Sequence, residues 1–155
     1  MNSKLEVYRF NELDLKDWDD FVDRSYNGTM FHTRRFLTYH PPDRFQDHSL
    51  YFQKKEKQYA AFLAASVNKE NGYILHSHPG ATIGSLVTNS SPSLKESFDL
   101  VTALVKYAQD ENFSGIKITL SPGIYSELMS NHIEFALVKM GFTYTKREVS
   151  SMLLL

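Results

Sequence analysis

The sequence predicts a layered α/β domain in which helices flank a mixed, mostly antiparallel central sheet. Three observations predict this class. Segments of strand and helix character follow one another in the order β-α-α-β-β-β-α-β-α-β. The run 59–67 is apolar almost throughout, which indicates a strand buried on both faces. The run 115–120 alternates apolar and polar residues between two amphipathic helices, which completes a β-α-β-α-β second half.

In the first half of the chain, hydrophobic periodicity and turn residues define the elements. Trp18, Phe21 and Val22 recur at helical spacing, and Asn27-Gly28 then stops the helix. A second, short helix ends where two prolines follow His40. The predicted strands are 5–10, 47–53 and 59–67, the predicted helices are 13–25 and 33–39, and 54–57 is a charged hairpin turn.

The stretch 73–87 organises the second half. It begins as an apolar strand, breaks at Pro79 and Gly80, and closes in a short apolar run. Ser91 is the predicted N-cap, and Pro92 the first residue, of a helix that runs to about residue 112. The remaining predictions are the strand 115–120, a helix over 126–140 that Gly141 closes, and one or two final strands within 142–155.

Composition bounds the function. The chain has 155 residues, which is the size of one domain, and its net charge of −1 shows no electrostatic footprint for DNA. It contains no cysteine, so disulfides and thiolate chemistry are excluded. The N-terminus lacks the apolar core of a signal peptide and no apolar run could cross a bilayer, so we expect a cytoplasmic protein without membrane insertion. The apolar end, residues 152–155, suggests a strand that packs against something.

His76 and His78 are the sharpest local signal, because they alternate on a predicted strand directly before Pro79. They could be partly buried, hydrogen-bonded histidines, or they could be polar groups in an acceptor cleft. In a cleft, His78 is the best candidate for a catalytic base, with His76 beside it. H-x-H-P also resembles the core of JAMM-type zinc isopeptidases. The aspartate ligand expected there is replaced by Asn89, so we expect no metal.

Three segments resemble GNAT acyltransferases, whose element order the whole chain follows. K-M-G-F at the end of the last predicted helix, residues 139–142, is similar to the close of many GNAT domains. W-x-x-F-V and N-G-T-x-F-H-T, within 18–33, resemble the start of FemAB-like GNAT proteins, which add aminoacyl or acyl groups to cell-envelope precursors. H-P-G-A-T-I-G-S-L-V, residues 78–87, resembles a segment of GNAT-domain proteins from bacterial surface-polysaccharide gene clusters.

The resemblance implies a donor loop, an acceptor site and a general acid. Acetyl-CoA or another acyl-CoA would be the donor, with aminoacyl-tRNA as the alternative. The donor-binding candidates are Gly80, Gly84, Ser85 and Asn89. His32 and Arg35 lie in the region that roofs the acceptor site in this fold, where Arg35 could clamp a carboxylate or phosphate. Tyr125 follows Ser121-Pro122-Gly123, where the sheet splays, and could donate a proton.

Each of these features also has a plainer explanation. The glycines could serve a bulge or turn, Arg35 could be a solvated side chain, and Tyr125 could simply pack.

Two positions depart from the usual GNAT pattern. The loop that usually reads Q/R-x-x-G-x-G/A and holds the coenzyme A pyrophosphate here spans 84–91, with one glycine and no arginine. The tyrosine that often acts as general acid is replaced by Leu137. FemAB-like proteins also lack the standard loop and use aminoacyl-tRNA. They are often built of two GNAT-like domains, so residues 1–155 are expected to form one domain, matching the first of such a pair.

The leading hypothesis is therefore a GNAT-fold, FemAB-like acyltransferase. It would transfer an acyl or aminoacyl group to an amine of a small molecule, a sugar or a cell-envelope precursor. The alternative is a non-catalytic GNAT-like half-domain that binds substrate or completes an interface. It would pair with a second copy or a second domain through the apolar C-terminus. The third, a JAMM-like zinc hydrolase, depends on His76 and His78.

Overall fold

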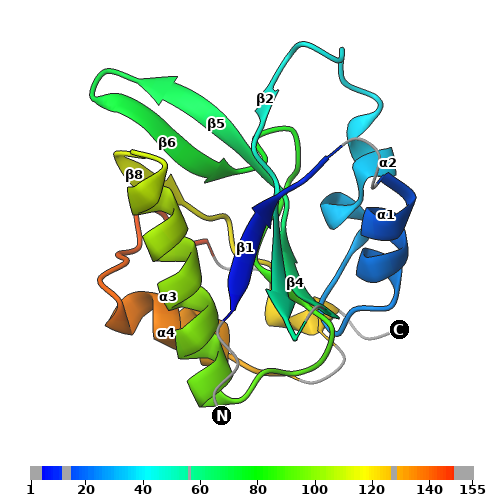
Figure 1. Cartoon of the computed structure of the whole chain (residues 1–155), viewed down its shortest axis with the longest axis vertical. Helices are drawn as coiled ribbons and strands as arrows, with labels where there is room; N and C mark the ends of the chain where they lie inside the picture. The colour runs from blue at the N-terminus through cyan, green and yellow to red at the C-terminus, as the bar shows by residue number, and fades with distance from the viewer. Residues whose placement is uncertain (1–4, 12–14, 56, 127–128, 149–155) are drawn as a thin grey trace.

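The computed structural model describes residues 5–11, 15–55, 57–126 and 129–148, and it shows two four-stranded sheets with helices on both sides (Figure 1). The strand orders are β1-β3-β4-β7 and β2-β5-β6-β8. The strands are β1 (Glu6–Arg9), β2 (Gln46–Asp47), β3 (Leu50–Lys54), β4 (Lys57–Phe62), β5 (Ala64–Lys69), β6 (Gly72–Ser77), β7 (Val87–Thr88) and β8 (Gly115–Lys117). The helices are α1 (Leu15–Asp23), α2 (Arg34–Leu37), α3 (Leu94–Asp110) and α4 (His132–Lys139), with 3-10 helices η2 (Met30–His32) and η3 (Gly123–Tyr125).

The two sheets are consecutive halves of one folded layer, because three successive segments of the chain contribute a strand to each half. The chain passes between the halves at His48 and Ser49, at Leu63, and through residues 78–86. We call the line along which these three crossings lie the crease. Backbone hydrogen bonds link the crossings: the His48 amide donates to the Ala64 carbonyl, and the His78 amide donates to the Leu63 carbonyl, both at 2.9 Å. The halves therefore stay coupled although their ladders are separate.

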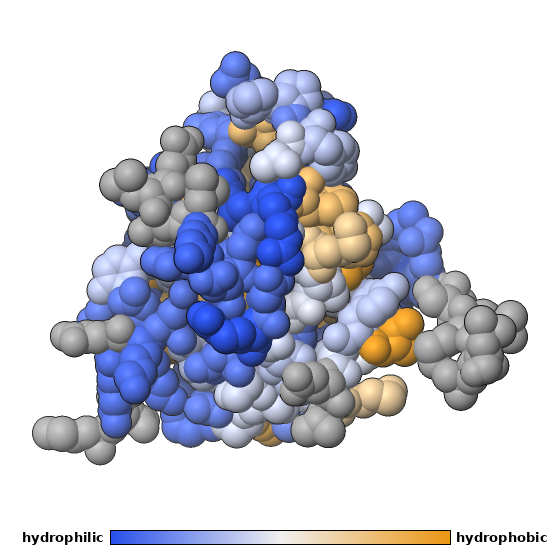
Figure 2. All heavy atoms as spheres, turned by 90° about the vertical axis from the view of Figure 1, so that its right-hand side faces the viewer, coloured by the Kyte–Doolittle hydropathy of each residue, from blue (hydrophilic) through white to orange (hydrophobic). Residues whose placement is uncertain are grey.

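The two faces of the layer carry two hydrophobic cores. Side chains of successive strand residues point to opposite faces, so Ala60 and Phe62 pack under α3 while Ala61 and Leu63 pack under α1. Trp18 is the largest side chain of the α1 core, and its indole N–H donates to the His32 carbonyl at 2.8 Å. The surface on the α1 side is mostly hydrophilic, with apolar residues mainly in the right half of the view (Figure 2).

The predicted fold class is confirmed, and several element predictions need correction. The predicted strand 47–53 is interrupted at His48 and Ser49, where the chain changes sheets, and only 115–117 of the predicted strand 115–120 form a strand, β8. The predicted strand 59–67 is two strands, because the chain changes sheets at Leu63. The N-cap of α3 is Ser93 rather than Ser91, because Ser93 forms a capping box with Glu96. The predicted helix 126–140 begins only at His132. Residues 142–148 form no strand, and the rest of that prediction, 149–155, lies outside the described residues.

No helix within the described ranges is both long enough and apolar enough to span a membrane.

Candidate functional site

The first feature of the site is a fork between two segments that leave the same parallel strand pair. β6 pairs with β8 from Ile74 opposite Gly115 to His76 opposite Lys117. Beyond this ladder, the Thr119 amide donates to Ser77 Oγ at 2.9 Å and the Gly84 amide donates to the Thr119 carbonyl at 2.8 Å. The first segment then joins β4 as β7, while the second continues to Ser121. We call the region between β7 and residues 120–121 the fork.

A chain of polar side chains lies at the base of the fork. Ser85 Oγ and Ser121 Oγ are 3.0 Å apart, and Ser121 Oγ is 3.5 Å from His32 Nε2. The Thr29 amide donates to His32 Nδ1 at 3.1 Å, so Nδ1 is an acceptor and the proton of the neutral ring lies on Nε2. His32 is fully buried, and burial lowers its pKa to about 4. The ring is therefore a neutral donor directed at Ser121 rather than a base.

His78, the predicted base, is buried on the other side of the crease. Its Nδ1 accepts a hydrogen bond from the Gly80 amide at 3.1 Å, and its ring packs edge-on against Phe45. Burial lowers the pKa of His78 to about 4, against the smaller opposite effect of Asp47. Within the described residues, no hydrogen bond connects His78 to the fork. Its role as a base stays a prediction.

His76 is half-buried, and its Nδ1 is buried without a hydrogen-bond partner. Burial lowers the pKa of His76, and Lys117 and Lys69 lower it further. No group of three or more histidine, aspartate or glutamate side chains among the residues described here could hold a metal ion. The zinc hydrolase alternative therefore has no third ligand in this part of the chain.

Close packing accounts for the two glycines expected to line a donor loop. A Cβ on Gly80 would lie 2.6 Å from the His40 ring, and a Cβ on Gly84 would lie 2.8 Å from Ser77 Cβ. The Gly80 carbonyl accepts hydrogen bonds from the Tyr39 hydroxyl and from His40 Nε2, each at 3.0 Å. Protein side chains thus occupy the space beside both glycines that a ligand would need, and their cofactor-binding role stays a prediction without structural support.

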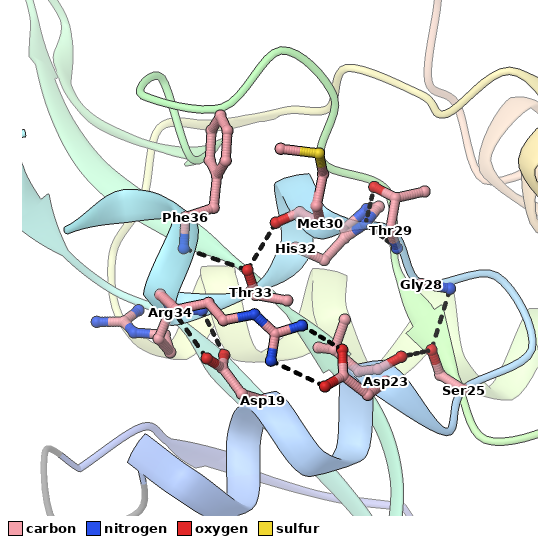
Figure 3. A network of polar contacts seen from close by, with 12 residues as sticks. Asp19, Asp23, Ser25, Gly28, Thr29, Met30, His32, Thr33, Arg34 and Phe36 are labelled. Atoms are coloured by element: carbon pink, nitrogen blue, oxygen red, sulfur yellow. Dashed lines mark hydrogen bonds and ion pairs between the residues drawn. The ribbon is translucent and has the colours of Figure 1, made fainter. Parts of the chain in front are cut away.

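The structure distinguishes two neighbouring arginines that the sequence presents as equivalent. The backbone amide of the first, Arg34, donates to Asp19 of α1 (Figure 3). Arg35, the predicted substrate ligand, is exposed, and its guanidinium donates to both carboxylate oxygens of Asp23 at 2.6 and 2.8 Å. This contact lowers the pKa of Asp23. Arg34 is instead partly buried, with its guanidinium stacked on the Phe10 ring at 4.1 Å. Arg34 is thus better placed than Arg35 to bind an anionic ligand. No local pattern in the sequence predicts which of the two arginines is the buried one.

The N-terminus of α3, where the family resemblance places a pyrophosphate, already holds a carboxylate of this chain. Glu96 Oε2 accepts from the Ser93 amide at 3.0 Å, and the Glu96 amide donates to Ser93 Oγ at 3.2 Å. The hydrogen bonds that the Glu96 carboxylate accepts from the Ser93 amide, the Ser93 hydroxyl and Lys54 lower the pKa of Glu96. Asn89, just before this helix, is exposed, and its amide donates to the Tyr59 carbonyl. A donor phosphate that bound the Ser93 amide would have to displace the Glu96 carboxylate, and the negative charge of Glu96 would oppose any phosphate at this helix terminus.

The last two positions concern the general acid. Tyr125 ends η3 and is half-exposed, so its hydroxyl is accessible, and its catalytic role stays a prediction. Leu137, at the position where many GNAT proteins have tyrosine, is buried and belongs to the core between α3 and α4. That position therefore serves packing in this chain.

Comparison with solved structures identifies the fold. No protein-family model matches the sequence, and no curated protein matches it. The structure is similar to a possible acetyltransferase from Clostridium difficile 630, with a TM-score of 0.56 and 13% identity over 97% of this chain and 99% of the other.

It is also similar to an aminoglycoside N-acetyltransferase in complex with CoA, with a TM-score of 0.55 and 11% identity over 98% of this chain and 96% of the other. A GNAT family acetyltransferase of Staphylococcus aureus gives a TM-score of 0.53 and 12% identity over 97% and 99%. At identities this low the structural similarity shows the fold alone, so this chain has the fold of GNAT acetyltransferases.

Proposed function

We propose that this chain is an acyltransferase domain that transfers an acyl or aminoacyl group to an amine. The acceptor would be a small molecule, a sugar or a FemAB-type cell-envelope precursor. The observation that carries the proposal is the fork, in which the segments after β6 and β8 separate and leave Ser85, Ser121 and His32 in one hydrogen-bonded chain at the base. The similarity to acetyltransferase structures supports the same reaction class.

The direction of that hydrogen-bond chain suggests the chemical role of its last member. His32 Nε2–H donates to Ser121, and either hydroxyl of the Ser121–Ser85 pair could donate to the other. In this proposal Ser121 donates to Ser85, which leaves the Ser85 hydroxyl proton for a further acceptor. A donor held in advance at a buried position stabilises negative charge that develops on a carbonyl oxygen during acyl transfer. In this proposal the amine attacks the donor carbonyl, Ser85 donates to the oxyanion, and the chain from His32 polarises Ser85.

The donor is proposed to be an acyl-CoA, with aminoacyl-tRNA as the alternative. An acyl-CoA needs the amides at the start of α3, where Glu96 now accepts the Ser93 amide. Glu96→Gln removes the competing charge and keeps the side-chain length. We therefore expect Glu96→Gln to tighten CoA binding, whereas aminoacyl-tRNA, held elsewhere, would be unaffected.

The decisive experiment is calorimetric titration with acetyl-CoA and free CoA, followed by an acetyl-transfer assay against a panel of amines. Wild-type protein, Glu96→Gln and the control Asp99→Asn, which changes an exposed acid of the same helix, are compared. Binding that strengthens only in Glu96→Gln supports an acyl-CoA donor. Ser85→Ala should then lower the transfer rate by about 10²-fold while leaving binding unchanged. Absence of both binding and transfer with acetyl-CoA and with aminoacyl-tRNA would contradict the proposal.

A second candidate is the non-catalytic GNAT-like half-domain, and the observation in its favour is the same Glu96. A helix terminus filled by the chain's own carboxylate is stable without a ligand. On this reading no acyl donor binds in any variant. Sedimentation or light scattering would then show self-association that depends on concentration.

A further inference from the structure

A pocket away from the fork is formed where β1 ends and α2 begins. It has a volume of about 440 Å³ and is lined by Arg9, Phe10, Asn11, Arg34 and Asp47. Arg9 is the last residue of β1, Arg34 the first residue of α2 and Asp47 the last residue of β2. Three elements far apart in the sequence thus bring two guanidinium groups and one carboxylate to one open cavity.

The guanidinium of Arg34 is held in place by one of its three nitrogens. Nη1 donates to an Asp47 carboxylate oxygen and, at 3.0 Å, to Ser49 Oγ. The plane of the group is fixed by the Phe10 ring at 4.1 Å, and the Trp18 ring lies at 5.8 Å. This anchoring means that the orientation of Arg34 is set before any ligand arrives.

The opposite edge of the same guanidinium carries two further donors, Nε and Nη2, which do not take part in the contacts with Asp47 and Ser49. Within the described residues, no hydrogen bond is made by Arg34 Nε or Nη2. These two nitrogens form the edge that binds two oxygens of a carboxylate or phosphate side by side. The side chain is only 14% exposed, so an oxyanion bound there would be partly shielded from solvent.

The charge of the pocket favours an anion. Arg9 Nη2 donates to the Asp47 backbone carbonyl at 2.7 Å, which places a second guanidinium beside Arg34 without using the carboxylate. Asp47 is occupied as an acceptor by Arg34, by the Ser49 amide and by the Ser49 hydroxyl. Among the described residues that line the pocket, two guanidinium groups against one carboxylate leave one positive charge in excess.

We propose that this pocket is an oxyanion-binding site that takes the carboxylate or phosphate group of a ligand, with Arg34 as the bidentate donor and Arg9 as the second cation. The inference does not depend on acyl transfer at the fork. A purely structural ion pair between Arg34 and Asp47 would need Nη1 alone. It would not require an open cavity or an aligned, unused edge on the same group.

The protein contains a built-in reporter for the test. Trp18 is the only tryptophan of the sequence, and its ring lies 5.8 Å from the Arg34 guanidinium. Inorganic phosphate and malonate are titrated separately while tryptophan fluorescence is followed, with sodium chloride at matched ionic strength as the blank. For such small anions we expect saturation with a Kd of about 1–10 mM. Saturation by phosphate alone, by malonate alone or by both identifies which oxyanion the site accepts.

Three variants assign the signal to the pocket. Arg34→Lys replaces the flat two-donor edge by a point charge and should weaken binding about tenfold. Arg9→Gln, at an exposed residue, should weaken it several-fold without unfolding the protein, so the test survives if Arg34→Lys is unstable. Arg35→Lys, the adjacent exposed arginine, should leave binding unchanged. The proposal is overturned if neither anion gives a saturable change, or if Arg9→Gln binds as tightly as wild type.

Discussion

Replacement of Gly84 by alanine tests whether packing or a ligand explains this glycine. The new Cβ would lie 2.8 Å from Ser77 Cβ and 3.2 Å from Ser77 Oγ. Ser77 cannot rotate away freely, because its Oγ accepts the Thr119 amide at 2.9 Å. Overpacking costs about 1–3 kcal/mol, and loss of one such hydrogen bond about 1 kcal/mol. We expect the free energy of unfolding to fall by about 2–3 kcal/mol, which lowers Tm by roughly 4–12 °C.

Urea unfolding followed by circular dichroism measures this change, and two further variants make it specific. Gly123→Ala is the matched control, because no atom of the described residues other than its chain neighbours lies within 4 Å of its new Cβ, and its stability should change by less than about 1 kcal/mol. Ser77→Gly removes the clashing atom, so Gly84→Ala should cost less in that background. If Gly84→Ala proves as stable as Gly123→Ala, the packing explanation is refuted and close approach of a ligand to Gly84 becomes the better one.

Three other predictions concern stability. The pKa of His32 is about 4 in the fold against 6.5 in the unfolded chain, so the unfolded state binds the proton first as the pH falls. Protonation of His32 should therefore lower the free energy of unfolding by up to about 3 kcal/mol between pH 6.5 and pH 4, in addition to the effect of His78, whose pKa is also about 4. His32→Gln should remove only the His32 share of that slope in urea titrations. Trp18→Phe leaves the buried His32 carbonyl without its donor and should cost about 2 kcal/mol or more by urea unfolding. Ser93→Ala should cost about 1 kcal/mol in thermal unfolding, whereas Ser91→Ala should change stability by less than about 0.5 kcal/mol.

The order of helices and strands can be predicted, because each element has its own hydrophobic periodicity. The crease between the two sheets cannot be predicted, because it depends on contacts between distant residues. Ser49 Oγ contacts both the carbonyl and the amide of Ala64, fifteen positions away, next to the point where the strand breaks. No pattern within the run 59–67 reveals such a partner. The N-cap of α3, in contrast, can be predicted from the sequence, because Ser93 and Glu96 have the spacing of a capping box. The prediction of Ser91 is wrong because it depends on Pro92 alone.

The site was less predictable because its parts meet only in three dimensions. His76 and His78 form a local pattern, whereas Ser121 lies 36 positions from Ser85 and 89 from His32, so no local pattern marks Ser121 as a site residue. Arg34 and Arg35 are neighbours of identical chemistry. Only the packing of Phe10 and Asp47 against one of them shows which arginine faces a cavity.

The segment 78–86 has the irregular backbone of a loop, yet most of its residues are buried, and Pro79 and Thr82 are the two exposed ones. Its amides at His78, Ala81 and Gly84 donate to backbone carbonyls, and Ile83 through Leu86 are buried. Hydrogen exchange at His78 and Gly84 should therefore be as slow as in the adjoining strands, and a protease should not cleave there before the domain unfolds. An insertion at this position would open the hydrophobic core instead of extending the surface, so affinity tags and reporter peptides belong at the hairpin turn 69–72, where the side chains are exposed.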